Sequence, residues 1–133
     1  MKTPEFVNSV ARKTKMSETD AERMAHAFLQ TLSERLTPKE AKDLAAQLPN
    51  GLSETVRKMH TGEVKPYTAD EFIKLFALRH DCGRAESERH AKAIWETLTE
   101  AVSAGEIDRV RTELSRDYER LFGASRFAEL TRA

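Results

Sequence analysis

The sequence repeats itself once, at a spacing of 66 residues. Pairing each residue from 5 to 56 with the residue 66 positions later gives 52 pairs without a gap, and 12 of these pairs are identical. Chance matching at this composition would give roughly three or four identities. Ten more pairs exchange one apolar residue for another, such as Phe28 for Ile94. We therefore predict an internal duplication, with repeat one at residues 4–59 and repeat two at residues 68–122.

Apolar residues in both repeats follow the spacing of amphipathic α-helices. In repeat one, four apolar residues from Ala41 to Leu48 stand at positions i, i+3, i+4 and i+7. Capping boxes mark helix starts, and the pattern occurs at 37–40, 68–71 and 103–106. The sequence therefore predicts an all-α fold, in which two tandem pseudo-symmetric repeats of short helices pack as one helical bundle.

We expect a single all-helical domain over residues 1–133. Residues 60–67 hold a Gly, a Pro and no long apolar period, and we interpret them as the linker between the repeats. Gly123 is suited to end the last repeat helix, and Ser125 to cap a short C-terminal helix over residues 125–131.

The two repeats differ in the size of their apolar side chains. Seven of the nine aromatic residues lie from Tyr67 onward, whereas repeat one is rich in Ala. Because small residues let helices approach closely, we expect the rings of repeat two to fill volume that repeat one leaves open. The two halves would then share one core, and each half alone would be marginally stable.

The charges of the chain balance. Lys and Arg together number 22, and Asp and Glu together number 22. This balance does not favour binding to nucleic acid or to an anionic membrane, which needs a basic excess on one face. The one cysteine excludes an intramolecular disulfide and indicates a reducing compartment. With no signal-peptide pattern and no run of eighteen apolar residues, we expect a soluble cytoplasmic protein with no membrane partner.

Several short motifs together resemble a known family. They are Glu5-Phe6, Arg35-Leu36, Glu40-Ala41, Leu44-Ala45, Gln47-Leu48-Pro49, the stretch from Glu100 to Glu106 and the ending from Tyr118 to Phe122. With these motifs the chain resembles the bacterial family called domain of unknown function 2267, over nearly its whole length. Repeat two has Leu114-Ser115 where repeat one has the family's Leu-Pro ending. The resemblance implies an all-helical fold and no particular activity.

Residue types that bind zinc occur near the start of repeat two. His80, Asp81 and Cys82 stand together, and His90 follows eight positions after Cys82. The spacing matches no established zinc pattern, and Cys82 and His90 align with Met16 and Met24 of repeat one. We therefore expect both residues to fill the core or its edge, with no metal site and no cysteine nucleophile.

Polar residues that occur in both repeats are a second set of candidates. Glu22-Arg23 recurs as Glu88-Arg89, and Thr31 with Glu34 recurs as Thr97 with Glu100. Paired carboxylates can bind a cation or act as acid and base. Structural roles also account for them, since Glu40 and Glu106 fit capping boxes, Glu22 and Glu88 fit first helical turns, and Glu34 and Glu100 fit polar faces. We therefore predict no catalytic, cofactor-binding or metal-binding residue and lean against an enzyme.

The sequence thus favours a non-enzymatic module that acts through protein contacts, with an unknown protein partner or as a homodimer. Four apolar residues are candidates for an exposed patch: Tyr67, Trp95, Phe127 and Leu130. The alternative is a regulator that binds a small ligand or nucleic acid through the basic segment Arg57–Lys65 and the groove between the halves. A helix-turn-helix over residues 41–59 would place Glu54 against the phosphates, which disfavours nucleic acid.

Overall fold

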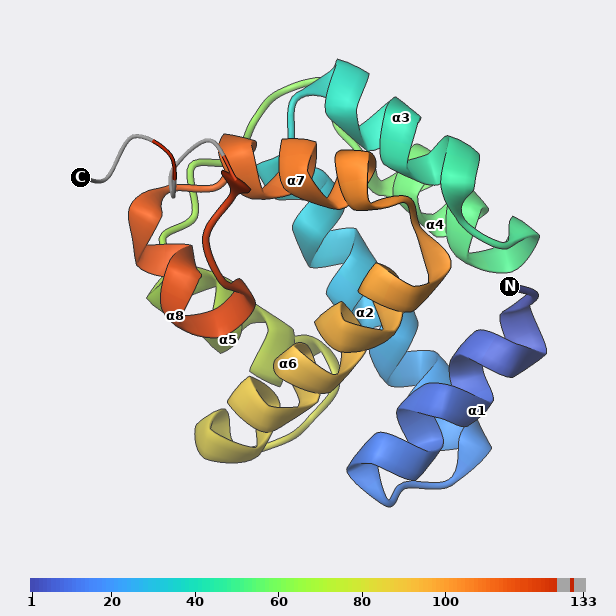
Figure 1. The fold of residues 1–133 in the computed structure, drawn as a ribbon. Coiled ribbons are helices and arrows are strands. Elements are labelled where there is room, and N and C mark those ends of the chain that lie inside the picture. The colour runs from blue at the N-terminus through green and yellow to red at the C-terminus, as the bar shows by residue number, and fades with distance from the viewer. Residues whose placement is uncertain (127–129, 131–133) are drawn as a thin grey trace.

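The computed structural model describes residues 1–126 and Leu130, and these residues form helices and no strand. The elements are α1 (Thr3–Thr14), α2 (Glu18–Arg35), α3 (Pro38–Gln47), α4 (Asn50–Met59), α5 (Ala69–Arg79), α6 (Arg84–Ala101), α7 (Ala104–Glu113), the 3-10 helix η1 (Arg116–Tyr118) and α8 (Glu119–Phe122). They pack as a helical bundle around α2, as Figure 1 shows. The predicted all-α fold is confirmed.

Helix bounds recur along the chain at the spacing of the sequence repeat. Both α2 and α6 span 18 residues and begin 66 positions apart, and both α3 and α7 span 10 residues and begin 66 positions apart. The repeats diverge at their ends, because the ten residues of α4 correspond to η1 and the four-residue helix α8. The pseudo-symmetric arrangement of the two repeats in space stays a prediction, and so do the boundaries of the repeats.

The starts of α3 and α7 differ from the predicted capping boxes. At α5 the box is complete, because Thr68 and Glu71 bond each other's backbone N–H groups. At α3 the Thr37 hydroxyl accepts from the N–H of Glu40, but the N–H of Thr37 donates to Glu113 Oε1 at 2.9 Å. At α7 the N–H of Ser103 donates to Gln47 Oε1 at 2.8 Å. The capping boxes predicted at 37–40 and 103–106 are therefore only half formed.

These bonds fix how α3 and α7 lie against each other. Gln47 is the last residue of α3 and caps the start of α7, while Glu113 is the last residue of α7 and caps the start of α3. Each helix therefore begins where the other ends, and the two run antiparallel along one side of the molecule (Figure 1). The donors that helix starts leave unpaired are satisfied by the opposite repeat.

The buried apolar residues of both repeats form one cluster. Phe28 of α2 lies at its centre, with edge-to-face ring contacts at centroid distances of 5.5 Å to Phe72, 5.6 Å to Phe76 and 5.9 Å to Phe122. Trp95 stacks on Phe122 at 4.6 Å and is only 4% exposed. The interpretation of Trp95 as part of an exposed patch is therefore wrong, because it packs inward against an aromatic ring.

The segment from 60 to 67 contains no helix and lies against the end of α2. The N–H of Lys65 donates to the carbonyl of Glu34 at 2.8 Å, and His60 Nε2 bonds the carbonyl of Leu36 at 2.8 Å. The predicted helix at 125–131 falls largely outside the described residues, as does Phe127, whereas Leu130 is exposed. None of the described helices has both the length and the apolar character needed to cross a membrane.

Candidate functional site

A pair of buried glutamates lies where α3 and α7 meet. Glu40 is in the first turn of α3 and Glu106 in the first turn of α7, at equivalent positions of the two repeats. Glu40 is 6% exposed and Glu106 is fully buried. One carboxylate oxygen from each of Glu40, Glu106 and Asp43 lies within 4.8 Å of the others. Because Glu113 and Gln47 occupy the N–H groups of the two N-caps, the glutamates turn into the interface instead of capping their own helices.

The environment of the pair disfavours full ionisation. No group of the described residues donates a hydrogen bond to Oε2 of Glu40 or to Oε2 of Glu106, although both atoms are buried. Burial and the neighbouring Glu106 raise the pKa of Glu40 to about 8. A proton held between two carboxyl groups supplies the donor that both oxygens lack.

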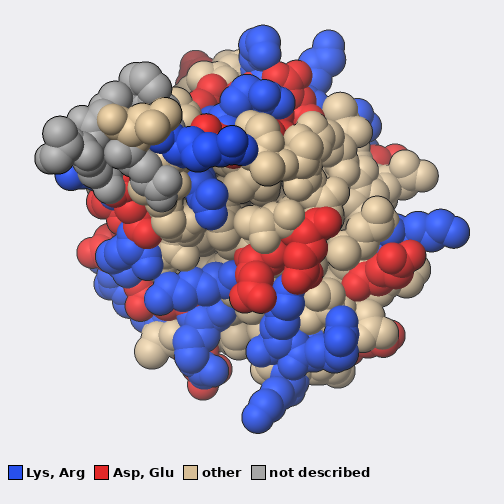
Figure 2. Space-filling model, in the orientation of Figure 1, with Lys and Arg blue, Asp and Glu red and all other residues tan. Residues whose placement is uncertain are grey.

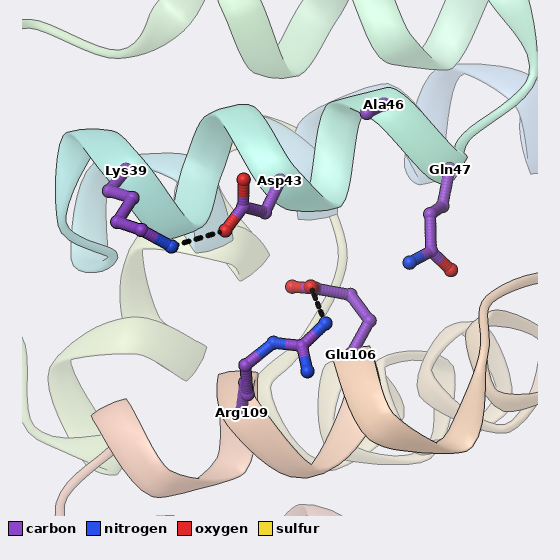
Figure 3. Close-up of a pocket in the computed structure, with 6 residues that line it drawn as sticks. All are labelled: Lys39, Asp43, Ala46, Gln47, Glu106 and Arg109. Atoms are coloured by element: carbon purple, nitrogen blue, oxygen red, sulfur yellow. Dashed lines mark hydrogen bonds and ion pairs between the residues drawn. The ribbon is translucent and has the colours of Figure 1, made fainter.

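Two cations lie on the rim of this pair. Arg109 Nη2 donates to Glu106 Oε1 at 2.9 Å, and Lys39 Nζ donates to Asp43 Oδ2 at 2.8 Å. These residues line a groove of about 500 Å³, here called the α3–α7 groove, whose lining residues are Lys39, Asp43, Ala46, Gln47, Glu106 and Arg109. Figure 3 shows the Glu106 carboxylate directed from α7 toward α3 and paired with Arg109, with the Lys39–Asp43 pair on α3.

The charge of the site has a simple consequence for its chemistry. With all three carboxylates ionised, Glu40, Asp43 and Glu106 carry three negative charges against the two positive charges of Lys39 and Arg109. The excess of one negative charge is buried beside two oxygens without donors. The arrangement therefore accepts a single positive charge, either a proton or one cationic group of a ligand.

Sequence reasoning assigned Glu40 and Glu106 to caps and so missed this site. The spacing of each glutamate from the apolar residues of its own helix indicates that both glutamates are buried. Glu40 stands four residues before Leu44, which is 1% exposed, and Glu106 stands four residues before Val110, which is also 1% exposed. Residues four apart share a helix face, so both acids lie on the buried face rather than the solvent face.

A second cluster lies at the corner between α5 and α6. His80 is the C-cap of α5, Cys82 follows in the turn, and His90 is on α6. One donor atom from each lies within 4.8 Å of the others. Burial lowers the pKa of both His80 and His90 and raises the pKa of the Cys82 thiol. His90 is buried, as its alignment with Met24 predicted, and the turn at Asp81 (φ 55°) brings His80 and Cys82 to its side.

The repeated Thr and Glu residues make contacts across the two halves. Arg79 donates to both oxygens of Glu34 at 2.8 and 3.0 Å and to the Thr31 hydroxyl at 3.0 Å. Glu34 is 8% exposed, so the prediction that it lies on a polar face is wrong. In the other repeat, the Lys13 ammonium donates at 3.0 Å to Thr97 and at 2.9 Å to Glu100, which is exposed. These residues tie each repeat to the other.

The repeated Glu-Arg pairs do not converge on a site. Arg23 pairs with Asp20 on its own helix at 3.2 Å, and Glu88 pairs with Arg120. Glu22 and Arg89 are exposed. Their contacts are those of surface residues of α2 and α6.

The basic segment Arg57–Lys65 contributes to a separate hollow. This groove measures about 360 Å³, and its lining residues are Pro38, Ala41, Lys42, Val56, Arg57, His60 and Gly62. Lys58 of the same segment lies 3.8 Å from Glu54, in an exposed ion pair. On the face of the molecule in Figure 2, basic and acidic side chains are interspersed.

Residues 3–121 match the family described as "Uncharacterized conserved protein (DUF2267)". The chain belongs to the DUF2267 family. The resemblance seen in the sequence motifs is thereby confirmed, and the match includes both Glu40 on α3 and Glu106 on α7. A search of curated proteins finds no match to this DUF2267 chain.

Proposed function

We propose that this DUF2267 protein is a non-enzymatic cytoplasmic binding module that acts through protein contacts. Its α3–α7 groove receives one basic side chain of a partner protein. The observation that supports this proposal is the pair of buried oxygens, Glu40 Oε2 and Glu106 Oε2, which have no donor among the described residues, together with the open groove that Glu106 lines. The single cysteine supports a reducing compartment.

The charge count favours a singly charged organic cation over a divalent metal ion. Lys39 and Arg109 lie within ion-pair distance of the acids, so a divalent ion would turn an excess of one negative charge into an excess of one positive charge. Calcium also takes six to eight oxygen ligands, roughly, and magnesium keeps a shell of waters. A side-chain guanidinium or ammonium group brings one charge and several donors.

Arginine suits the groove better than lysine. The guanidinium group is planar, carries about five N–H donors in fixed directions and forms paired hydrogen bonds with carboxylates. Asp43 lines the groove from α3 and Glu106 lines it from α7, so a fork of donors meets a carboxylate from each helix. On binding, the cation replaces the proton that the two carboxyl groups share.

Nuclear magnetic resonance with a matched pair of probes tests this proposal. N-acetyl-arginine amide carries the cation, and N-acetyl-citrulline amide has nearly the same shape without the charge. We expect the arginine probe to shift the side-chain signals of Glu106 and Arg109 in a saturable way and the citrulline probe to leave them unchanged. Glu106→Gln should abolish the shifts, while Glu54→Gln on the exposed face of α4 should retain them.

Two outcomes would contradict the proposal. Equal shifts with the citrulline probe would show that charge does not govern binding. Saturable binding of calcium or manganese that Glu106→Gln abolishes, with no response to the arginine probe, would make the groove a metal site instead. Affinity purification from the native host identifies the partner protein. The partner should bind the unaltered protein, should not bind Glu106→Gln, and should be released by arginine amide. Sedimentation of the purified protein in an analytical ultracentrifuge tests whether a second copy of the chain is the partner, since a homodimer sediments faster than the monomer.

The alternative is a small-ligand or nucleic-acid-binding regulator that uses the Arg57–Lys65 segment. The groove of about 360 Å³ beside Arg57 and His60 supports it, since this groove joins apolar walls to basic side chains. Binding to mixed-sequence DNA at low salt, measured by fluorescence anisotropy, tests the nucleic-acid form of this alternative. Binding that weakens with added salt and with Arg57→Gln would support it, and no binding at low salt would contradict it.

A further inference from the structure

The corner between α5 and α6 gathers three side chains that the proposed function does not use. His80 is the C-cap of α5, Cys82 lies in the following turn, and His90 lies on α6, six residues after its first residue Arg84. Their donor atoms lie within 4.8 Å of one another although the residues span 10 positions of the chain. The cluster is partly shielded, because His90 is buried and both His80 and Cys82 are half-buried.

The orientation of His80 is fixed by two contacts with Phe76. Its Nδ1 lies 2.6 Å from the carbonyl oxygen of Phe76, and its ring stacks on the Phe76 ring at 4.0 Å. A carbonyl only accepts, so Nδ1 carries the proton and Nε2 presents a lone pair. A backbone carbonyl that holds one ring nitrogen in this way is the usual support of a metal-binding histidine.

The spacing of the two histidine nitrogens fits a tetrahedral ion. His80 Nε2 accepts a hydrogen bond from His90 Nδ1 at 3.2 Å, and a bound ion would replace this bond, with the His90 proton then on Nε2. Two histidine nitrogens at about 2.0–2.1 Å from a tetrahedral zinc ion stand about 3.3–3.4 Å apart. Two nitrogens and one thiolate form a donor set that suits zinc better than it suits magnesium or calcium, which bind oxygen ligands.

A carboxylate outside the cluster contributes to the charge around it, together with Arg23 and Arg89. Glu86 stands four residues before His90 on α6, and residues four apart share a helix face. Its charge acts on His80, Cys82 and His90 alike. Glu86 is exposed, so its carboxylate can turn toward the cluster, and a water molecule can take the same position.

We propose that His80, Cys82 and His90 bind one zinc ion, through His80 Nε2, His90 Nδ1 and the Cys82 thiolate, with Glu86 or water as the fourth ligand. Binding releases the thiol proton of Cys82 to solvent, and zinc remains in its divalent state. The ion joins the end of α5 to α6 and so stiffens this corner of repeat two. The aligned residue Met16 leaves the first repeat without a thiolate at this place.

Equilibrium dialysis of the full chain against zinc tests the proposal, with any affinity tag removed and zinc measured by elemental analysis. We expect one zinc ion per chain and a higher melting temperature with zinc, because an ion that binds only the folded state stabilises that state. Cobalt in place of zinc should give the visible bands of a tetrahedral site and a thiolate-to-cobalt charge-transfer band. These spectra report on the unaltered protein and need no variant to fold.

Variants identify the ligands. Cys82→Ser should abolish the charge-transfer band and the rise in melting temperature, and His80→Ala should abolish zinc retention. His26→Ala is the matched control on α2, where the imidazole bonds Thr55 at 2.6 Å, and it should retain both. Failure of the unaltered protein to take up zinc, or equal uptake by Cys82→Ser and the unaltered protein, would overturn the proposal.

Discussion

At the scale of single residues, identical side chains in the two repeats occupy different environments. Glu34 is buried beside Arg79, whereas its counterpart Glu100 is exposed beside Lys13. A buried charge that loses its partner stays desolvated, whereas an exposed charge returns to water. The two equivalent pairs should therefore differ in their contributions to stability.

Replacing the cation of each pair with methionine tests this difference while keeping the aliphatic stem. Arg79→Met leaves Glu34 buried and unpaired and should lower the free energy of unfolding by about 3 kcal/mol. Lys13→Met should lower it by about 1 kcal/mol or less, because Glu100 is accessible to water. Urea denaturation measures both values. Equal losses in the two variants would contradict the assignment of Glu34 as the buried partner.

The buried pair Glu40 and Glu106 should make stability depend on pH. The pKa of Glu40 is raised from 4.5 to about 8 by burial and by Glu106. Between these values the folded protein holds a proton that the unfolded chain has lost, so stability falls as pH rises, by up to about 1.4 kcal/mol per pH unit. Glu40→Gln should flatten this slope in urea denaturation at pH values from about 5 to about 8.

Asp43→Asn is the control for this pH prediction. The Lys39 ammonium beside Asp43 holds the pKa of that carboxyl below its ordinary value, so Asp43 is ionised in both states throughout the window. Asp43 comes last among the groups that raise the pKa of Glu40, so the variant should keep most of the slope of the unaltered protein. A slope that survives in Glu40→Gln would assign the titration to another group.

At the scale of elements, α3 and α7 are joined through their ends. Glu113 bonds the N–H of Thr37 at 2.9 Å and accepts from the Thr37 hydroxyl at 2.6 Å, and Gln47 bonds the N–H of Ser103 at 2.8 Å. Because each cap comes from the other repeat, neither helix start is complete within its own half. Because Glu113 and Gln47 bond the N-cap N–H groups, Glu40 and Glu106 do not cap their own helices and instead form the site at the α3–α7 groove.

Removing the Glu113 side chain tests whether α7 caps the start of α3. Glu113→Ala leaves the N–H of Thr37 without its acceptor and should lower the free energy of unfolding by about 1.5–3 kcal/mol, the range for hydrogen bonds to charged groups. Thr112→Ala, at the exposed neighbouring position, should change it by less than about 0.5 kcal/mol. Amide hydrogen exchange at the start of α3 should quicken only in Glu113→Ala. A loss confined to α7 would contradict a cap that acts across the halves.

At the scale of the whole molecule, the core is built from both repeats. Phe28 of repeat one contacts Phe72, Phe76 and Phe122 of repeat two, and these residues belong to one buried cluster. The ion pairs of Glu34 with Arg79 and of Lys13 with Glu100 also cross between the repeats. A half without its partner would expose this surface to water.

Residues 1–62 expressed alone should therefore fail to unfold cooperatively. The rings that pack on Phe28 and the acceptor for the N–H of Thr37 come from repeat two, so we expect a weak and broad thermal transition, measured by circular dichroism and calorimetry. The full chain provides the reference transition. A sharp transition near that of the full chain would mean that repeat one has a sufficient core of its own.

The sequence by itself determined the helices, because apolar spacing and cap residues are local and act wherever the chain lies. The 66-residue spacing predicted the recurrence of helix bounds, and the motifs predicted the family. Only the tertiary structure shows which residues come together at the two candidate sites. Glu40 and Glu106 are 66 positions apart, and whether they cap their own helices or face each other depends on Gln47 and Glu113 of the opposite repeat. His80, Cys82 and His90 meet because one turn reverses the chain, and no spacing rule along a single helix places them together.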